Sequence, residues 1–99
     1  MDIKRVQSED RLILFLDGRL DVITSPRLDA ELKRSLPTIN KLVLDFSSLS
    51  YISSAGIRVI LSTQKQLSSQ DKKFCLRHVS EPIMDVLEMT GITDTITIE

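Results

Sequence analysis

Short runs of apolar, β-prone residues alternate along this chain with segments whose apolar residues recur at helical spacing. Alternation of this kind is typical of an α/β domain, in which helices connect neighbouring strands of one sheet. Strand–helix–strand connections favour parallel pairing with right-handed crossovers. The sequence therefore predicts an α/β fold with a mixed, mostly parallel sheet and three main helices packed on it.

The expected order of elements is β-β-α-β-α-β-α-β. The run at residues 11–16 is nearly continuous apolar, which suits a strand that is covered on both faces. Asp17-Gly18 has turn chemistry and is expected to end that strand. The segment from Ser47 to Ile52 is expected to be a loop that follows a central strand. The predicted strands span residues 3–8, 11–16, 41–46, 72–79 and 95–98.

Each predicted helix has recognisable start or stop signals. Thr24-Ser25-Pro26 offers a hydroxyl cap and an early proline, and Pro37 is expected to end the helix that begins there. A second helix is expected from residue 53 or 54 to about residue 68, on an apolar stripe. The third opens at Ser80-Glu81-Pro82 in the same way as the first, and Gly91 is placed to end it in the left-handed conformation.

The composition favours one globular domain over residues 1–99. Thirteen basic and fourteen acidic residues give a formal charge of −1, which argues against direct binding to nucleic acid. The apolar stretches are far shorter than the roughly 20 residues needed to span a bilayer, so no membrane contact is expected. The single cysteine excludes an internal disulfide and fits a reducing, cytoplasmic location.

The residue types that carry catalysis or bind metals do not form a recognisable set. Cys75 lies within a predicted strand and is expected to be a small buried hydrophobe. His78 is the only histidine, so neither a zinc site nor a serine–histidine nucleophile is supported. We therefore expect no enzymatic activity, no metal and no cofactor. Three further acidic residues are scattered at strand ends without a paired-carboxylate pattern: Asp10, Asp17 and Asp45.

Three segments resemble the signature of the STAS family, which includes anti-sigma factor antagonists and the cytoplasmic domains of some anion transporters. The first runs from Leu42 to Leu61, and within it Ser53-Ser54-Ala55-Gly56-Ile57 is similar to the family's Ser-Ser-Ala-Gly-Leu or Asp-Ser-Ser-Gly-Leu. Gly18-Arg19-Leu20-Asp21 resembles the family's Gly-Glu-Leu-Asp, and Met89-Thr90-Gly91-Ile92 resembles Met-Ser-Gly-Leu. The three matches stand in the family's order and cover nearly the whole chain.

The resemblance implies that the protein is an anti-sigma factor antagonist. Ser54 matches the serine that the partner, an anti-sigma factor with serine kinase activity, phosphorylates, and a serine phosphatase reverses the modification. Asp21 matches an acidic position beside the phosphorylation loop. Ser53 departs from the aspartate that many members have there, which bears on the choice of kinase. The implied partner-binding residues are Asp21, Ser53, Ser54, Ala55, Gly56 and Arg58.

The physics of helix termini favours a switch at Ser54. The first turn of a helix tolerates an added phosphate, because its N–H groups are free and the helix dipole is positive there. A bound partner would have to desolvate the same phosphate. We therefore expect unmodified Ser54 to permit binding, which releases a sigma factor for transcription, and phosphoserine to block it. Gly56 is expected to let a partner's backbone approach closely.

Plainer interpretations remain open. Ser53 and Ser54 are common helix caps, Gly56 could serve close packing, and Asp21 could be a turn or capping acid. The same domain could also work without phosphorylation, as a STAS subunit of a transport or signalling complex. The free protein is expected to be a monomer.

Overall fold

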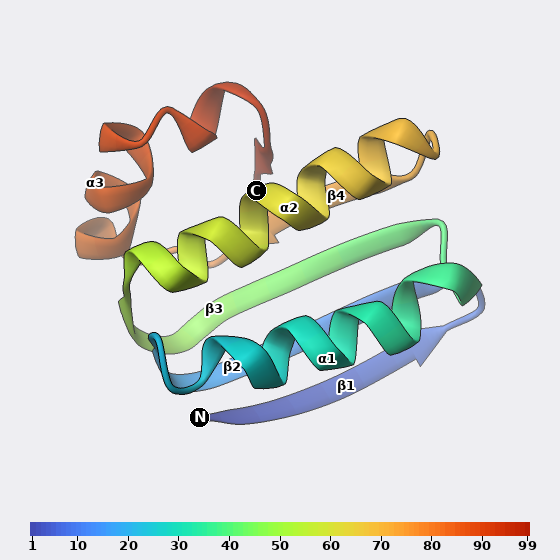
Figure 1. Cartoon of the computed structure of the whole chain (residues 1–99), viewed down its shortest axis with the longest axis horizontal. Helices are drawn as coiled ribbons and strands as arrows, with labels where there is room; N and C mark the ends of the chain where they lie inside the picture. The colour runs from blue at the N-terminus through green and yellow to red at the C-terminus, as the bar shows by residue number, and fades with distance from the viewer.

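A five-stranded sheet with the strand order β1-β2-β3-β4-β5 is the frame of the molecule in the computed structural model, which describes residues 1–99 (Figure 1). β1 pairs antiparallel with β2, and the other neighbouring pairs are parallel. The predicted mixed, mostly parallel sheet is therefore confirmed. The strands are β1 (Asp2–Ser8), β2 (Arg11–Leu20), β3 (Lys41–Ile52), β4 (Lys73–Arg77) and β5 (Thr97–Ile98).

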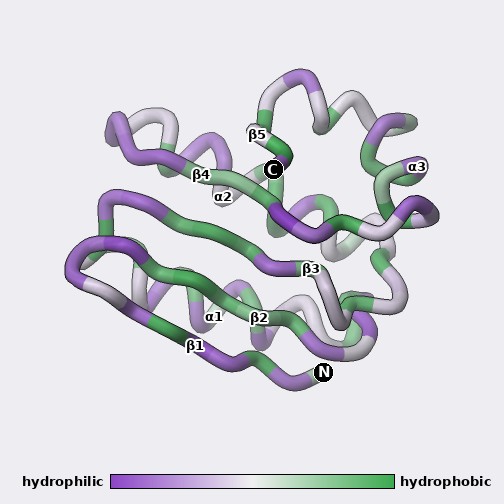
Figure 2. Tube along the Cα trace, turned by 180° about the vertical axis from the view of Figure 1, so that it is seen from behind, coloured by the Kyte–Doolittle hydropathy of each residue, from purple (hydrophilic) through white to green (hydrophobic).

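Three helices connect the parallel strands, as predicted: α1 (Ser25–Ser35), α2 (Ser54–Ser69) and α3 (Glu81–Met89). Because strand order follows chain order, each crossover advances in the same direction, and crossovers of one hand then place their helices on one face of the sheet. α1 and α2 lie across that face in Figure 1. Figure 2, seen from behind, shows the strands with no helix in front of them.

The main core lies between the sheet and the helices. Alternate residues of β2 and β3 point to the helical face, as expected for the period of two in a strand. They pack against apolar stripes on the helices, and 22 buried residues form one cluster. Its members include Leu12, Leu14 and Leu16 from β2, Leu42, Leu44 and Phe46 from β3, and Leu28, Leu32, Ile57, Ile60, Leu67, Ile83 and Leu87 from the helices.

Two strands extend further than their local chemistry predicts. Asp17-Gly18 does not end β2, which continues to Leu20, and residues 47–52 are not a loop but the second half of β3. The two extensions pair with each other through register shifts, and the φ of Gly18 is 110°. The predicted turn and loop were wrong because hydrogen bonds between the extended strands outweigh the turn propensity of these residues.

The last two strands are shorter than predicted. β4 pairs with the first five residues of β3 and ends at Arg77, where His78 turns the chain with a φ of 55°. A short 3₁₀ turn (Ile92–Asp94) precedes β5, which pairs only with Cys75 and Leu76. Gly91 has a φ of 76°, which confirms its predicted left-handed conformation after α3.

Candidate functional site

Ser54 is the first residue of α2 and is exposed at the end of the sheet where the parallel strands finish. β3 ends at Ile52, and Ser53 has the extended conformation of an N-cap residue, with φ −108° and ψ 175°. The N–H of Ser53 donates to the carbonyl of Leu20, 2.9 Å away, which ties the start of α2 to the end of β2. The predicted position of the Ser54 hydroxyl at a helix N-terminus is confirmed.

The first turn of α2 has no side-chain cap. The Ser53 carbonyl accepts the first helical hydrogen bond from the N–H of Ile57 at 3.0 Å, but the Ser53 hydroxyl caps nothing. That hydroxyl oxygen is buried and has no hydrogen-bond partner. The interpretation of Ser53 as a side-chain cap is therefore wrong, and no side chain competes for the first N–H groups of the helix.

Asp21 organises the turn between β2 and α1. Its Oδ1 accepts hydrogen bonds from the N–H groups of Ile23 and Thr24, both at 3.0 Å. The N–H of Thr24 is the main cause of the lowered pKa of Asp21, with further contributions from the Thr24 hydroxyl, Ile23 and nearby Arg19. Asp21 is therefore ionised at neutral pH, and it is the turn acid that its residue type suggested, since neither N–H group that it accepts belongs to α1.

The predicted capping role of Thr24 is not observed. Its hydroxyl instead donates to the carbonyl of Arg19 at 2.7 Å and accepts from the N–H of Asp21 at 2.9 Å. Ser80, the predicted cap of α3, makes no side-chain cap hydrogen bond either. The Asp21 carboxylate therefore holds the turn before α1, and the Asp21 carbonyl accepts the N–H and the hydroxyl of Ser25, the first residue of the helix.

Gly56 is buried and faces the interior of the molecule. A Cβ atom at this position would lie 2.7 Å from Cγ and 2.9 Å from Cδ2 of Leu20. Real Cβ atoms do not approach other atoms so closely. The expectation that Gly56 opens the helix to a partner's backbone is therefore wrong, and the close-packing interpretation is correct: the glycine lets the first turn of α2 rest on the end of β2.

The loop before α1 and the first turns of α2 form one continuous surface. Val22 and Ile23, next to Asp21, are 71% and 80% exposed. Val22 shares a shallow groove of about 330 Å³ with Ala55 and Arg58 of α2. The fold thus brings the predicted residues Asp21, Ala55 and Arg58 to one surface with Ser54.

Two adjacent apolar residues with so much exposed surface are unusual in a small domain. Exposed apolar patches commonly mark interaction sites. Val22 and Ile23 are candidate site residues that the sequence-based prediction did not include. Their position within the turn that follows Asp21 was the signal that could have found them. Tyr51, 40% exposed at the end of β3, is a further large apolar side chain nearby in the sheet, and the Arg19 guanidinium stacks 4.1 Å from its ring centroid.

A second polar cluster, also missed, surrounds Asp45. This residue lies in the middle of β3 rather than at a strand end and is only 1% exposed. Its Oδ2 accepts from Arg77 Nε at 2.7 Å and lies 2.9 Å from His78 Nδ1, while the N–H of Ser47 donates to Oδ1 at 2.9 Å. Burial of Asp45 disfavours its charged form, but these hydrogen bonds outweigh that cost and lower its pKa to about 2.

The remaining candidate for side-chain chemistry is the thiol of Cys75. Cys75 is buried, and burial together with nearby Glu99 raises the pKa of its thiol to about 11. This confirms the prediction of a small buried hydrophobe. No group of three or more potential metal ligands occurs in the structure, and none of its helices combines the length and apolarity needed to cross a membrane.

Comparison with known proteins places these features in a family context. The family model described as STAS domain matches residues 2–99. BtrV of Bordetella bronchiseptica is 35% identical over 81 residues, which cover 81% of this chain and 70% of BtrV. A Staphylococcus epidermidis protein named anti-sigma-B factor antagonist is 29% identical over 96 residues, 95% of this chain and 88% of that protein.

Solved structures agree with the fold. The anti-sigma factor antagonist SpoIIAA from Bacillus in its unphosphorylated form superposes with a TM-score of 0.81 at 15% identity, over 99% of this chain and 87% of SpoIIAA. Its phosphorylated form gives 0.79 at 16% identity, over 99% and 91%. At these identities the similarity shows a shared fold.

Proposed function

Because this chain belongs to the STAS domain family, we propose that it is an anti-sigma factor antagonist whose binding is switched by phosphorylation of Ser54. Unphosphorylated, it binds an anti-sigma factor with serine kinase activity and so releases a sigma factor for transcription. The observation that carries this proposal is the exposed Ser54 hydroxyl at the uncapped start of α2, beside the Asp21 turn. Relatives named anti-sigma-B factor antagonists support the choice of partner.

The fold can accept a phosphate on Ser54. Phosphoserine carries about −1.5 to −2 charges at pH 7. The positive end of the α2 dipole and its first N–H groups, which no side chain caps, would stabilise that charge locally. Phosphorylation therefore alters the surface without unfolding the helix.

The binding surface cannot accept the same charge so easily. The proposed surface comprises Asp21, Ser53, Ser54, Ala55 and Arg58, and the exposed Val22 and Ile23 extend it. Gly56 is buried beneath this surface and sets the position of the helix. Interface centres are depleted of charge, and an unpaired buried charge costs several kcal/mol. Each ~1.4 kcal/mol of lost binding free energy weakens the affinity tenfold. The ionised carboxylate of Asp21, in the neighbouring loop, also repels the phosphate.

The chain acts in this scheme as a binding module rather than an enzyme. The partner contributes the kinase and its ATP, and a serine phosphatase restores the free hydroxyl. No cofactor is needed by the antagonist itself. We place the protein in the cytoplasm, where its transcriptional partners act, and as a monomer when it is free.

Binding of Ser54 variants to the anti-sigma factor of the same organism tests the proposal. Ser54→Ala should bind like the unphosphorylated wild type, and Ser54→Asp should bind at least about tenfold more weakly, as isothermal titration calorimetry would measure. Ser68→Asp, an equal charge change on an exposed serine near the other end of α2, is the matched control and should retain binding. Equal affinities for the alanine and aspartate variants at position 54 would contradict the switch.

Mass spectrometry of the native protein separates the switch from the alternative of a STAS subunit in a transport or signalling complex. The switch requires phosphate on Ser54 that increases when the partner kinase and ATP are supplied. A chain that stays unmodified at Ser54 in the presence of that kinase would favour the alternative.

A further inference from the structure

The face of the sheet that carries no helix, hereafter the helix-free face, has a chemistry of its own. Figure 2 shows no helix in front of its strands, and the middle segments of β2 and β3 are apolar. Val43 and Cys75 are paired in register, and they are buried apolar residues that lie outside the main core. On the neighbouring strands Ile13 pairs with Val43, and Val6, 45% exposed, pairs with Ile13. An apolar row therefore crosses four strands on a face that no helix covers. Val43 and Cys75 are already buried within this face, whereas Ile13 is partly exposed and Val6 is exposed.

A row of cations lies beside the apolar row. Arg11, Lys41 and Lys73 are the first residues of β2, β3 and β4, and they are paired with one another in register. We call these three residues the cation row. None of them belongs to an ion pair in the structure. Like charges placed directly opposite on neighbouring strands destabilise a sheet, so the isolated domain gains nothing from this arrangement.

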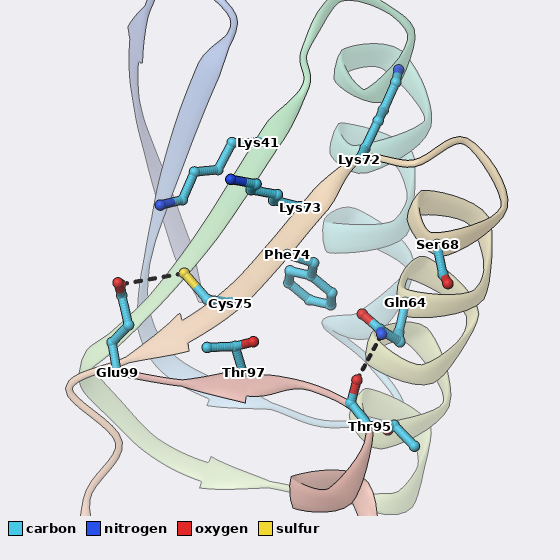
Figure 3. A pocket seen from close by; sticks show the side chains of 10 residues that line it. All are labelled: Lys41, Gln64, Ser68, Lys72, Lys73, Phe74, Cys75, Thr95, Thr97 and Glu99. Atoms are coloured by element: carbon cyan, nitrogen blue, oxygen red, sulfur yellow. Dashed lines mark hydrogen bonds between the residues drawn. The ribbon is translucent and has the colours of Figure 1, made fainter.

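The two rows share one side of the sheet. Lys41, Lys73 and Cys75 project to the same side of β4 in Figure 3, whereas Phe74 points toward α2. They line a pocket of about 390 Å³ that continues past the short β5. Glu99 is the carboxylate at this pocket, and it accepts a hydrogen bond from the Cys75 thiol at 3.3 Å rather than pairing with a lysine. The cation row is thus open to an external acidic group.

We propose that the helix-free face is a second protein-binding surface, which takes a partner segment carrying acidic and apolar side chains together. Its carboxylates pair with the cation row, and its apolar side chains contact Val6 and Ile13, the members of the apolar row that keep exposed surface. The pairing relieves the repulsion among the three cations and buries apolar surface at the same time.

The composition favours a protein over other anionic partners. A polyanion such as nucleic acid would meet a chain of formal charge −1, and three cations are few for phosphate-driven binding. An apolar strip with charges at its border matches the anatomy of protein interfaces. The cation row lies at the amino ends of the strands, whereas Ser54 follows the carboxyl end of β3. The second surface is therefore independent of the proposed switch, and both surfaces can be occupied at once.

An NMR titration of the ¹⁵N-labelled chain tests the proposal with a synthetic helical peptide in which glutamates border a stripe of leucines, so that one side of the helix presents both. Amide shifts should concentrate in the first halves of β2, β3 and β4 and spare residues 53–58. Arg11→Glu and Lys73→Glu should each weaken binding severalfold. Lys65→Glu, the same charge change on an exposed residue of α2, is the control and should leave it unchanged.

A stability measurement distinguishes a binding role from a structural one. Lys73→Glu puts a carboxylate beside Lys41, so it should raise the urea midpoint of the free chain while it weakens peptide binding. A lower midpoint would overturn the view that the cation row is unfavourable in isolation.

Four results of the titration would overturn the proposal. The first is that amide shifts are absent or lie elsewhere, and the second is equal binding of a peptide with lysine in place of glutamate. The third is stronger binding of inorganic phosphate or anionic vesicles at the same residues. The fourth is that the amide shifts of this face depend on protein concentration without peptide, which would identify a second copy of the chain as its occupant. Failure of the Ser54 experiment would leave all these outcomes unchanged, since the two surfaces share no residue.

Discussion

Individual residues at the site work through backbone placement more than through side-chain chemistry. Asp21 holds its own turn by accepting two N–H groups, and Ser53 begins α2 through its carbonyl while its hydroxyl stays unpaired. Gly56 contributes the absence of a side chain, which lets Leu20 fill the space beside the first helical turn. The position of Ser54 therefore depends on a contact made two residues away.

Gly56→Ala tests that contact. The added methyl group would collide with Leu20, and overpacking of this kind costs about 1–3 kcal/mol of unfolding free energy. Urea denaturation would measure the loss. Leu20→Ala removes the obstacle, so the double variant should be more stable than the sum of the two single losses predicts. Strictly additive effects would show that the two residues do not compete for the same space.

On the helix-free face of the sheet, the Asp45 network joins neighbouring elements. Asp45 of β3 contacts Arg77 at the end of β4 and His78 in the turn toward α3. The Arg77 guanidinium also lies 5.6 Å from the ring centroid of Phe15 in β2. The buried carboxylate thus links β3 to the end of β4 and to the turn toward α3, and Arg77 extends the network to β2.

Acid should weaken this link in a defined pH range. The folded-state pKa of Asp45, about 2, is below its ordinary value of 3.8, so its contribution is complete above about pH 4 and is lost as the pH falls toward 2. The contribution is about 2 kcal/mol, because one pKa unit corresponds to about 1.4 kcal/mol.

Urea denaturation of the wild type and Asp45→Asn at pH 7 and at pH 2.5 would measure it. The variant should be less stable at pH 7 and should lose less stability on acidification. A pH dependence identical to that of the wild type would assign the acid sensitivity to other carboxylates.

In the molecule as a whole, the candidate site and the apolar core occupy different places. Ser54 and the Asp21 turn lie where the parallel strands finish, the general location of binding sites in open α/β sheets. The core between sheet and helices holds this end in place, and the 22 residues of its cluster are all apolar. A charge added at Ser54 therefore meets solvent and helix backbone rather than the core.

The phosphorylated molecule should accordingly keep its fold. Ser54→Asp should preserve the far-ultraviolet circular dichroism spectrum and leave the thermal midpoint equal or slightly raised, because an acid in the first helical turn gains about 0.3–1 kcal/mol from the dipole. The same variant should lose affinity for the anti-sigma factor. A loss of helical signal would mean that the switch acts by unfolding α2 instead of by excluding the partner.

Local signals were sufficient for the fold class, the three helices and the place of Ser54. Prolines at helix starts, the left-handed Gly91, and apolar spacing all act within a few residues, so they are legible in the sequence. Family resemblance added the proposed roles of Ser54 and Asp21, which the spacing of residues alone does not reveal.

The remaining features depend on residues that are far apart in the chain. Hydrogen bonds between β2 and β3 turned an expected turn and loop into strand, because a backbone ladder outweighs local propensity. The closeness of Gly56 to Leu20 and the burial of Asp45 exist only once the sheet has formed. Periodicity and end signals therefore specified the elements, whereas pairing across the sheet decided how far each strand extends, which side chains are buried, and which face stays open.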